Sequence, residues 1–203
     1  MFALFVIVAI AGLVVTGYAP KDRLTWWLEV TPVVIALVLL AWTRKRFPLT
    51  PLAYALIAVH AVILMIGGHY TYAEVPFGFW MERVLHLTRN HYDRIGHFAQ
   101  GFVPALVTRE ILLRRTPLKP GAMLSFLVVC VCLAISAFYE LIEWWTALIA
   151  GTGATAFLGT QGDVWDTQWD MLTALIGALT CVLLMSRAHN RALARLGNDR
   201  SSA

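Results

Sequence analysis

Residues 26–42 read WWLEVTPVVIALVLLAW, and the basic triplet Arg44-Lys45-Arg46 follows almost at once. Within this run Glu29 is the one ionisable side chain. At about 1.5 Å per residue, a helix of this length is short but adequate to cross a hydrocarbon core of about 30 Å. Basic residues gather on the cytoplasmic side of membrane proteins. The stretch therefore predicts a transmembrane helix that ends in the cytoplasm.

The composition of the whole chain also favours a membrane protein. Of the 203 residues, 59% are apolar and only 14% are charged, and the mean hydropathy is +0.69. A soluble domain has about 45–50% apolar and about 25% charged residues. The length leaves no room for a second sizeable domain. We therefore expect an all-α fold with one transmembrane helical-bundle domain over residues 1–203.

Six apolar runs predict a polytopic protein with six transmembrane helices. The expected spans are 2–18, 26–42, 51–69, 93–113, 121–149 and 166–185. The 70–92 connection contains a helical stripe of apolar residues on a segment that is too short and too charged to cross. The stripe consists of Phe77, Trp80, Met81, Val84 and Leu85. This pattern is typical of a short interfacial helix that lies on the bilayer.

The distribution of basic residues predicts the orientation of the bundle. If both termini are cytoplasmic, eleven of the 16 lysines and arginines lie inside and five lie outside. Anionic lipid and this asymmetry account for the net charge of +4, so we expect no nucleic-acid partner. The three cysteines lie in apolar runs without a metal or redox spacing.

Three helices carry a polar pair at the end that this orientation places on the periplasmic side. The pairs are Asp93 with His97, Glu140 with Glu143, and Asp166 with Asp170. Spacings of three or four residues put both members of a pair on one helix face. An ionised carboxylate in hydrocarbon is costly unless it is paired or metal-bound. We therefore expect the three pairs to converge beneath the periplasmic surface.

Several partners could neutralise such a cluster. Arg89 and Arg94 could form a buried ion-pair network that joins the helices. One or two divalent metals are the alternative, because mixed carboxylate and imidazole ligands suit zinc, manganese or iron. The spacing matches no specific metal motif, since neither Glu-x-x-His nor His-Glu-x-x-His occurs. A proton or ion path is a third interpretation, although only His60 and Gln100 continue it towards the midplane.

Three longer motifs carry a resemblance to a known family. They are HYDRIGHF at 91–98, YELIEW at 139–144 and GDVWDTQWDM at 162–171. Together they resemble the YjdF-like family of small bacterial inner-membrane proteins, and the likeness extends over nearly the whole chain. The resemblance implies a multi-pass protein of the bacterial inner membrane and does not specify a reaction.

A more distant likeness involves the same motifs. The DRIGHF segment at 93–98, followed by a Glu-bearing helix and an Asp-led final helix, is similar to the VanZ-like proteins linked to glycopeptide resistance. In that group the final helix usually opens with an Asp and an Asn. Here Asp166 and Asp170 occupy the comparable places and the Asn is absent, which weakens any transfer of an envelope-related function.

The favoured hypothesis is a metal-dependent membrane enzyme, a hydrolase or transferase acting on a lipid or envelope precursor at the periplasmic end. The expected ligands are Asp93, His97, Glu140, Asp166 and Asp170. Glu143 would act as general base on a metal-bound water, and Arg94 would orient an anionic substrate. Residues expected around the ligands or the substrate are His69, His91, Gln100, Asp163, Trp144 and Trp165.

Two other functions remain open at this point. A non-catalytic membrane scaffold would use the polar cluster only as a buried salt-bridge network. An ion- or proton-coupled transporter would need polar groups that continue through the midplane, and these are scarce. Membrane lipid is the expected partner under each hypothesis.

Overall fold

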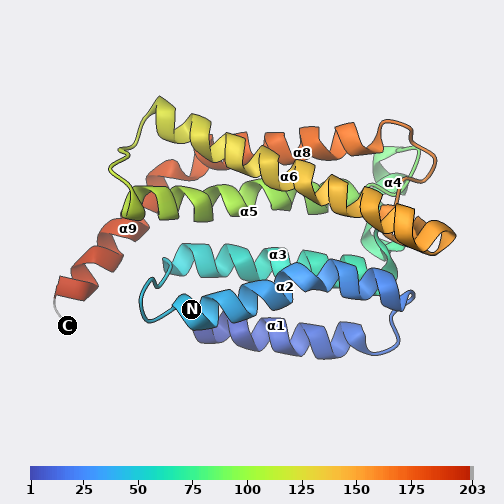
Figure 1. The fold of residues 1–203 in the computed structure, drawn as a ribbon, viewed down its shortest axis with the longest axis horizontal. Coiled ribbons are helices and arrows are strands. Elements are labelled where there is room, and N and C mark those ends of the chain that lie inside the picture. Colours follow the sequence, from blue (N-terminus) through green and yellow to red (C-terminus); the bar gives the residue numbers. More distant parts are fainter. Residues whose placement is uncertain (202–203) are drawn as a thin grey trace.

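The computed structural model describes residues 1–201, and within this range the chain forms helices and loops without a strand (Figure 1). The long helices are α1 (Phe2–Gly17), α2 (Arg23–Thr43), α3 (Pro51–Tyr70), α5 (Tyr92–Arg115), α6 (Ala122–Ala150) and α8 (Asp166–Thr180). They begin and end close to the predicted residues, which confirms the all-α class. Residues 202–203 of the expected domain lie outside the described range.

Four helical segments are long and apolar enough to cross a membrane. They are Arg23–Thr43, Pro51–Tyr70, Ala122–Ala150 and Asp166–Gly197. Helix α1 is apolar but has 16 residues, and α5 has 24 residues with charged side chains at both ends. Large apolar side chains such as Val14, Val38 and Leu183 are exposed on the outside of the bundle. This exposure suits contact with lipid and supports a multi-pass membrane protein.

Local sequence explains where the helices start. Asp22 caps α2, because its side chain accepts a hydrogen bond from the Thr25 backbone N–H at 2.7 Å. Thr50 caps α3 in the same way through the N–H of Ala53, and Pro51 occupies the first helical position, where no N–H is needed. These caps set the ends of two helices whose interiors are stabilised mainly by packing.

The helices form two groups that meet along α3 and α5 (Figure 1). Helix α3 packs against α1 and α2, and α5 packs against α6 and α8. The seam between α5 and α8 is unusually close. A side chain at Gly101 would overlap the carbonyl oxygen of Ala174, and one at Gly177 would overlap that of Phe98. Small residues let membrane helices approach to backbone contact, and here they bring the polar residues of α5 and α8 together.

The 70–92 connection is helical, as predicted. It contains the short η1 (Tyr72–Glu74) and α4 (Pro76–Leu85). The apolar residues Phe77, Trp80, Val84 and Leu85 are half-exposed or more. The stripe therefore faces outward rather than into the bundle, as an interfacial helix requires. A second connection, between α6 and α8, contains η2 (Gly151–Ala154) and α7 (Thr155–Leu158).

The C-terminal helical segment continues beyond the expected span. After α8, residues Cys181–Met185 form one stretch of π-helix (η3), and α9 (Ser186–Ser201) follows without a break. Figure 1 shows α9 leading away from the bundle at the end where α1 begins. The prediction of a span ending at 185 marks the apolar part correctly, but the helix itself does not stop there.

Candidate functional site

The start of α5 is fixed by Asn90, which is buried just before the helix. Its side-chain oxygen accepts a hydrogen bond from the Tyr92 N–H at 3.0 Å, and its amide nitrogen donates to the carbonyl of Val75 at 3.0 Å. Gln161 donates to the Asn90 carbonyl at 2.8 Å. These bonds tie α5 to α4 and to the loop before α8, so the first turns of α5 hold their polar side chains in a defined place.

His97 is the centre of the site and is 5% exposed. Its Nε2 lies 3.4 Å from Oδ1 of Asp93 and 3.5 Å from Oδ1 of Asp170. Its Nδ1 lies 3.2 Å from the side-chain oxygen of Gln100 and 3.9 Å from a carboxylate oxygen of Glu140. One imidazole therefore faces groups from α5, α6 and α8.

The hydrogen bond to Gln100 constrains the chemistry of His97. An amide oxygen only accepts hydrogen bonds, so Nδ1 carries the hydrogen and donates to it. In a neutral ring Nε2 would then be a bare lone pair facing the carboxylates of Asp93 and Asp170. That arrangement is repulsive unless Nε2 is protonated or a cation lies between the three groups. His97 is therefore an imidazolium in an ion pair, a metal ligand, or a neutral ring that accepts a hydrogen bond from a protonated aspartic acid.

A second set of contacts joins α5 to the start of α8 through two arginines. Arg94 is hydrogen-bonded to Asp170 and, at 2.8 Å, to Asp166. Arg89 donates to the same oxygen of Asp166 at 2.6 Å. Asp163 lies 3.5 Å from Arg89 and 3.7 Å from Arg94. The predicted ion-pair network is thus present on the outer side of His97.

Glu140 differs from the other acidic residues of the site. Its side chain is 7% exposed, and neither carboxylate oxygen makes a hydrogen bond of standard geometry within the described residues. The Thr167 side chain on α8 is close enough to form a looser hydrogen bond with it. One turn earlier on α6, the buried Ser136 hydroxyl also lacks a hydrogen-bond partner in this part of the chain. Buried polar groups are normally satisfied, so these two side chains are candidates for contact with a bound ion or water.

A small cavity adjoins His97 on the side of α2 and α6. It measures about 20 Å³, which is enough for one water molecule or ion. Glu29 and Glu143 line it, and the Tyr139 hydroxyl donates to Glu29 at 3.1 Å. Tyr72 from η1 lines it too, and burial raises the pKa of its phenol, which keeps that hydroxyl neutral.

Two sets of three side chains could hold a metal ion, and both include His97. The first is Asp93, His97 and Asp170, and the second is His97, Glu140 and Glu143. In each set the ligand atoms lie within 4.8 Å of one another. Two ligands bound tetrahedrally to zinc at about 2.1 Å are about 3.4 Å apart. The separations of 3.4 and 3.5 Å from His97 Nε2 to the two aspartates match that spacing.

The remaining predicted residues lie at different distances from this centre. Asp166 is in neither ligand set, because its oxygen is held by Arg89 and Arg94. His91 stands at the start of α5, where burial and the nearby arginines lower its pKa. His69 is turned away towards α1, with Nδ1 2.8 Å from the carbonyl of Thr16.

Two predicted tryptophans are exposed at the edge of the bundle. Trp144 is 55% exposed and Trp165 is 62% exposed. Neither lines the cavity beside His97. Their amphipathic rings are typical of the lipid–water interface, so they mark the rim of this end rather than the inside of the site.

A second polar network lies at the opposite end of the same helices. Glu110 is fully buried and accepts hydrogen bonds from the Thr50 N–H at 2.9 Å, the Thr50 hydroxyl at 2.7 Å and Arg114 at 2.6 Å. His189 Nε2 lies 3.1 Å from it. Arg109 can only donate, so His189 accepts at Nδ1 over 2.9 Å and donates from Nε2 to Glu110. We call this the inner network only to distinguish it from the His97 site at the opposite end of the helices, and it is fully satisfied.

Comparison with known proteins now adds the family. A protein-family model described as "Predicted membrane protein (DUF2238)" matches residues 1–191. The chain belongs to this family. It is 60% identical to "Inner membrane protein YjdF" of Escherichia coli (strain K12) over 185 residues, which cover 91% of this chain and 88% of that protein. The predicted resemblance to the YjdF-like family is confirmed, and no solved structure matches.

Membership of this family and the apolar helices together identify an integral inner-membrane protein. The likeness to VanZ-like proteins is not among these matches and stays a prediction. Sequence reasoning missed Glu29, Tyr72 and Tyr139, which join the site of this family member from α2, η1 and α6. Glu29 did give a signal, because it is a lone carboxylate in an apolar span and needs a partner.

Proposed function

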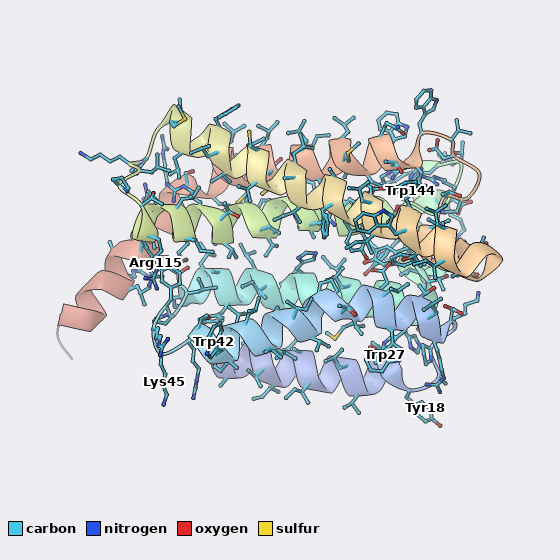
Figure 2. The ribbon with its side chains drawn as sticks, in the orientation of Figure 1. Tyr18, Trp27, Trp42, Lys45, Arg115 and Trp144 are labelled. Atoms are coloured by element: carbon cyan, nitrogen blue, oxygen red, sulfur yellow. The ribbon has the colours of Figure 1, made fainter. Side chains whose placement is uncertain are left out.

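We propose that α1, α2, α3, α5, α6 and the α8–α9 segment all cross the inner membrane, with both termini in the cytoplasm and the His97 site at the periplasmic end. The basic residues support this orientation. Figure 2 places Trp42, Lys45 and Arg115 towards one end, and Tyr18, Trp27 and Trp144 towards the other. Aromatic residues at both ends suit the two interfaces, and the basic end suits the cytoplasm.

Within this frame we propose a metal-dependent membrane enzyme of the hydrolase or transferase type. The observation that carries the proposal is the buried Glu140 carboxylate, which makes no hydrogen bond of standard geometry within the described residues and lies beside His97 and Glu143. An ion pair with the arginines cannot explain it, because Arg89 and Arg94 are bonded to the aspartates of α8. A divalent cation beside His97 would satisfy the Glu140 carboxylate.

The site residues divide into three roles. Asp93, His97, Asp170 and Glu140 would hold zinc, manganese or iron, while Asp166 keeps Arg94 in place beside them. A bound divalent metal supplies a water whose pKa falls towards ~7. Glu143 lines the cavity next to His97 and would accept the proton from that water.

The depth of the site favours a lipid-linked or envelope substrate. Arg94 is only partly buried at the periplasmic end, so its guanidinium could orient an anionic group there. The exposed Trp144 and Trp165 would surround an approaching lipid headgroup at the interface.

Metal analysis of protein purified in detergent tests this function. We expect about one divalent metal per chain after extensive washing, and loss of most of it in Glu140→Gln and in His97→Ala. Glu74→Gln is the matched control, because Glu74 is exposed, pairs only with Lys21 among the described residues, and belongs to neither ligand set. Metal that washes off the wild-type protein, or that is unchanged in both site variants, would refute the proposal.

The arginine network supports a second candidate function, a non-catalytic membrane scaffold. Arg94 is bonded to Asp166 and Asp170 and thereby joins α5 to α8. A double-mutant cycle on Arg94→Gln and Asp170→Asn separates the two functions. Coupling of about 1–3 kcal/mol in protein that retains no metal would favour the scaffold.

A further inference from the structure

An apolar groove runs between the two helix groups, away from the His97 site. Its upper stretch has a volume of about 290 Å³ and is lined by residues of α2, α3 and α5, including Ala36 and His60. Its lower stretch has a volume of about 370 Å³ and ends at Phe47 and Arg115. The two stretches adjoin each other, because Leu39, Leu40 and Val107 line both. Volumes of this size are typical of ligand pockets.

The side chains that line the groove are nearly all apolar, and a basic residue lies at its end. Arg115 is exposed, lies over the Phe47 ring at 4.7 Å and makes no ion pair within the described residues. The neighbouring Arg114 is used differently, since it is bonded to Glu110. A free guanidinium at the end of an apolar groove is complementary to an anionic headgroup with an attached chain.

The length of the groove fits one membrane leaflet. On α2 its lining extends from Pro32 to Thr43, which at about 1.5 Å per residue is about 16 Å. Half of a hydrocarbon core of about 30 Å is about 15 Å. A chain that starts at Arg115 and follows the groove would therefore end near the midplane, where His60 lines the upper stretch.

We propose that this groove binds one acyl chain of an anionic phospholipid, whose phosphate contacts Arg115. With the orientation given under the proposed function, the lipid comes from the cytoplasmic leaflet. The inference rests on that placement of the helices across the bilayer, but it does not require a metal or a reaction at His97. The bound lipid would fill the space between α2 and α5 and so join the two helix groups.

Native mass spectrometry of the protein released from mild detergent tests the groove. We expect one retained phospholipid per wild-type chain and at least a fivefold loss in Val107→Trp, where the indole would fill the shared middle of the groove. Val38→Trp is the control, because Val38 is exposed on α2 and lines neither stretch. Equal retention in the two variants would overturn the proposal, and so would a dimer whose interface occupies the groove.

The same measurement with mixed lipids tests the charge at the mouth. Arg115→Gln should lower the preference for anionic over zwitterionic phospholipid by about fivefold, as expected for one interfacial charge. Lys119→Gln removes an equal charge from the exposed loop after α5 and should leave the preference unchanged. An equal effect of both substitutions would mean general attraction to the membrane surface and would overturn a specific site.

An experiment on the unmodified chain guards against variants that fail to fold. A phospholipid with a photoactivatable acyl chain, retained in detergent and then illuminated, should label residues 57–64 and 103–107. Labelling confined to outer faces such as that of Val38 would refute the groove. Metal content measured on the same samples keeps the two proposals distinct, because the groove variants should retain any metal that the wild-type protein binds.

Discussion

Glu140 and Glu110 are both buried glutamates in one helical bundle, yet their surroundings are opposite. Glu110, at the inner end, accepts hydrogen bonds from Thr50, Arg114 and His189. Glu140, at the outer end, accepts none of standard geometry within the described residues. A buried acid with all its acceptors filled stabilises a fold, whereas an unsatisfied one costs free energy unless a ligand completes it. The difference separates a structural network from a candidate binding site.

The largest expected effect comes from exchanging the two glutamates for glutamine in the presence of a chelator. Glu110→Gln leaves Arg114 without its buried partner, so we expect a loss of about 3–5 kcal/mol in the free energy of unfolding. Glu140→Gln removes a buried charge that makes no hydrogen bond of standard geometry within the described residues and has only the more distant His97 ring at 3.9 Å, so we expect stability that is unchanged or higher. Reversible unfolding in mixed micelles, followed by tryptophan fluorescence, measures both.

The contrast between Glu110 and Glu140 would be wrong if the two substitutions changed stability equally. Equal destabilisation would mean that Glu140 has a structural partner and that the outer cluster is a second fold-stabilising network. A repeat with added zinc or manganese sharpens the result. The metal should raise the stability of the wild-type protein but not that of Glu140→Gln, since a ligand stabilises only the state that binds it.

An intermediate effect is expected at the α5–α8 seam. Gly101→Ala places a methyl group against the Ala174 carbonyl oxygen, and overpacking of this kind costs about 1–3 kcal/mol. The helices must separate, so Asp93 and Asp170 should move apart and metal affinity should fall with stability. Gly121→Ala is the control, because a side chain there meets no neighbouring atom. Unchanged metal affinity in Gly101→Ala would show that the packing of α5 against α8 does not control metal binding at the site.

The smallest effect concerns pH. Burial, with Arg89 and Arg94 nearby, lowers the pKa of His91 in the folded protein. The unfolded chain then binds a proton more readily, so stability should fall as the pH drops below the ordinary histidine pKa of 6.5. We expect less than ~1 kcal/mol between pH 7 and 5, because His91 is only partly buried. His91→Asn should weaken the pH dependence of the free energy of unfolding. If the variant and the wild-type protein show the same dependence, His91 is not its cause.

Helical spacing was sufficient to predict which side chains share a face. The four-residue step from Asp93 to His97 and the three-residue step from Glu140 to Glu143 led directly to the convergent cluster, and the convergence is confirmed. Spacing could not assign partners between helices. Asp166 is hydrogen-bonded to two arginines because α5 and α8 lie close together. That close packing depends on Gly101 and Gly177, and their role can be recognised only when the facing helix is known.

The same limit applies to the network around Glu110. Arg109 and Arg114 lie near Glu110 on the same helix, and Glu110 pairs with Arg114. Arg109 instead contacts His189 and Asn190, because the last helix continues past its apolar part and passes alongside α5. A polar segment after an apolar run gives no local signal of where its side chains will dock.

The π-helical stretch Cys181–Met185 fixes the angle about the helix axis between the side chains before it and those after it. One helical rod presents Asp170 to the outer site and His189 to the inner network, and the wide turn between them sets the angle from one to the other. Deleting a single residue there would tighten the turn and rotate everything beyond it by about 100°. His189 would then lose its contacts with Arg109 and Glu110, while Asp170, which precedes the deletion, would keep its contacts with α5.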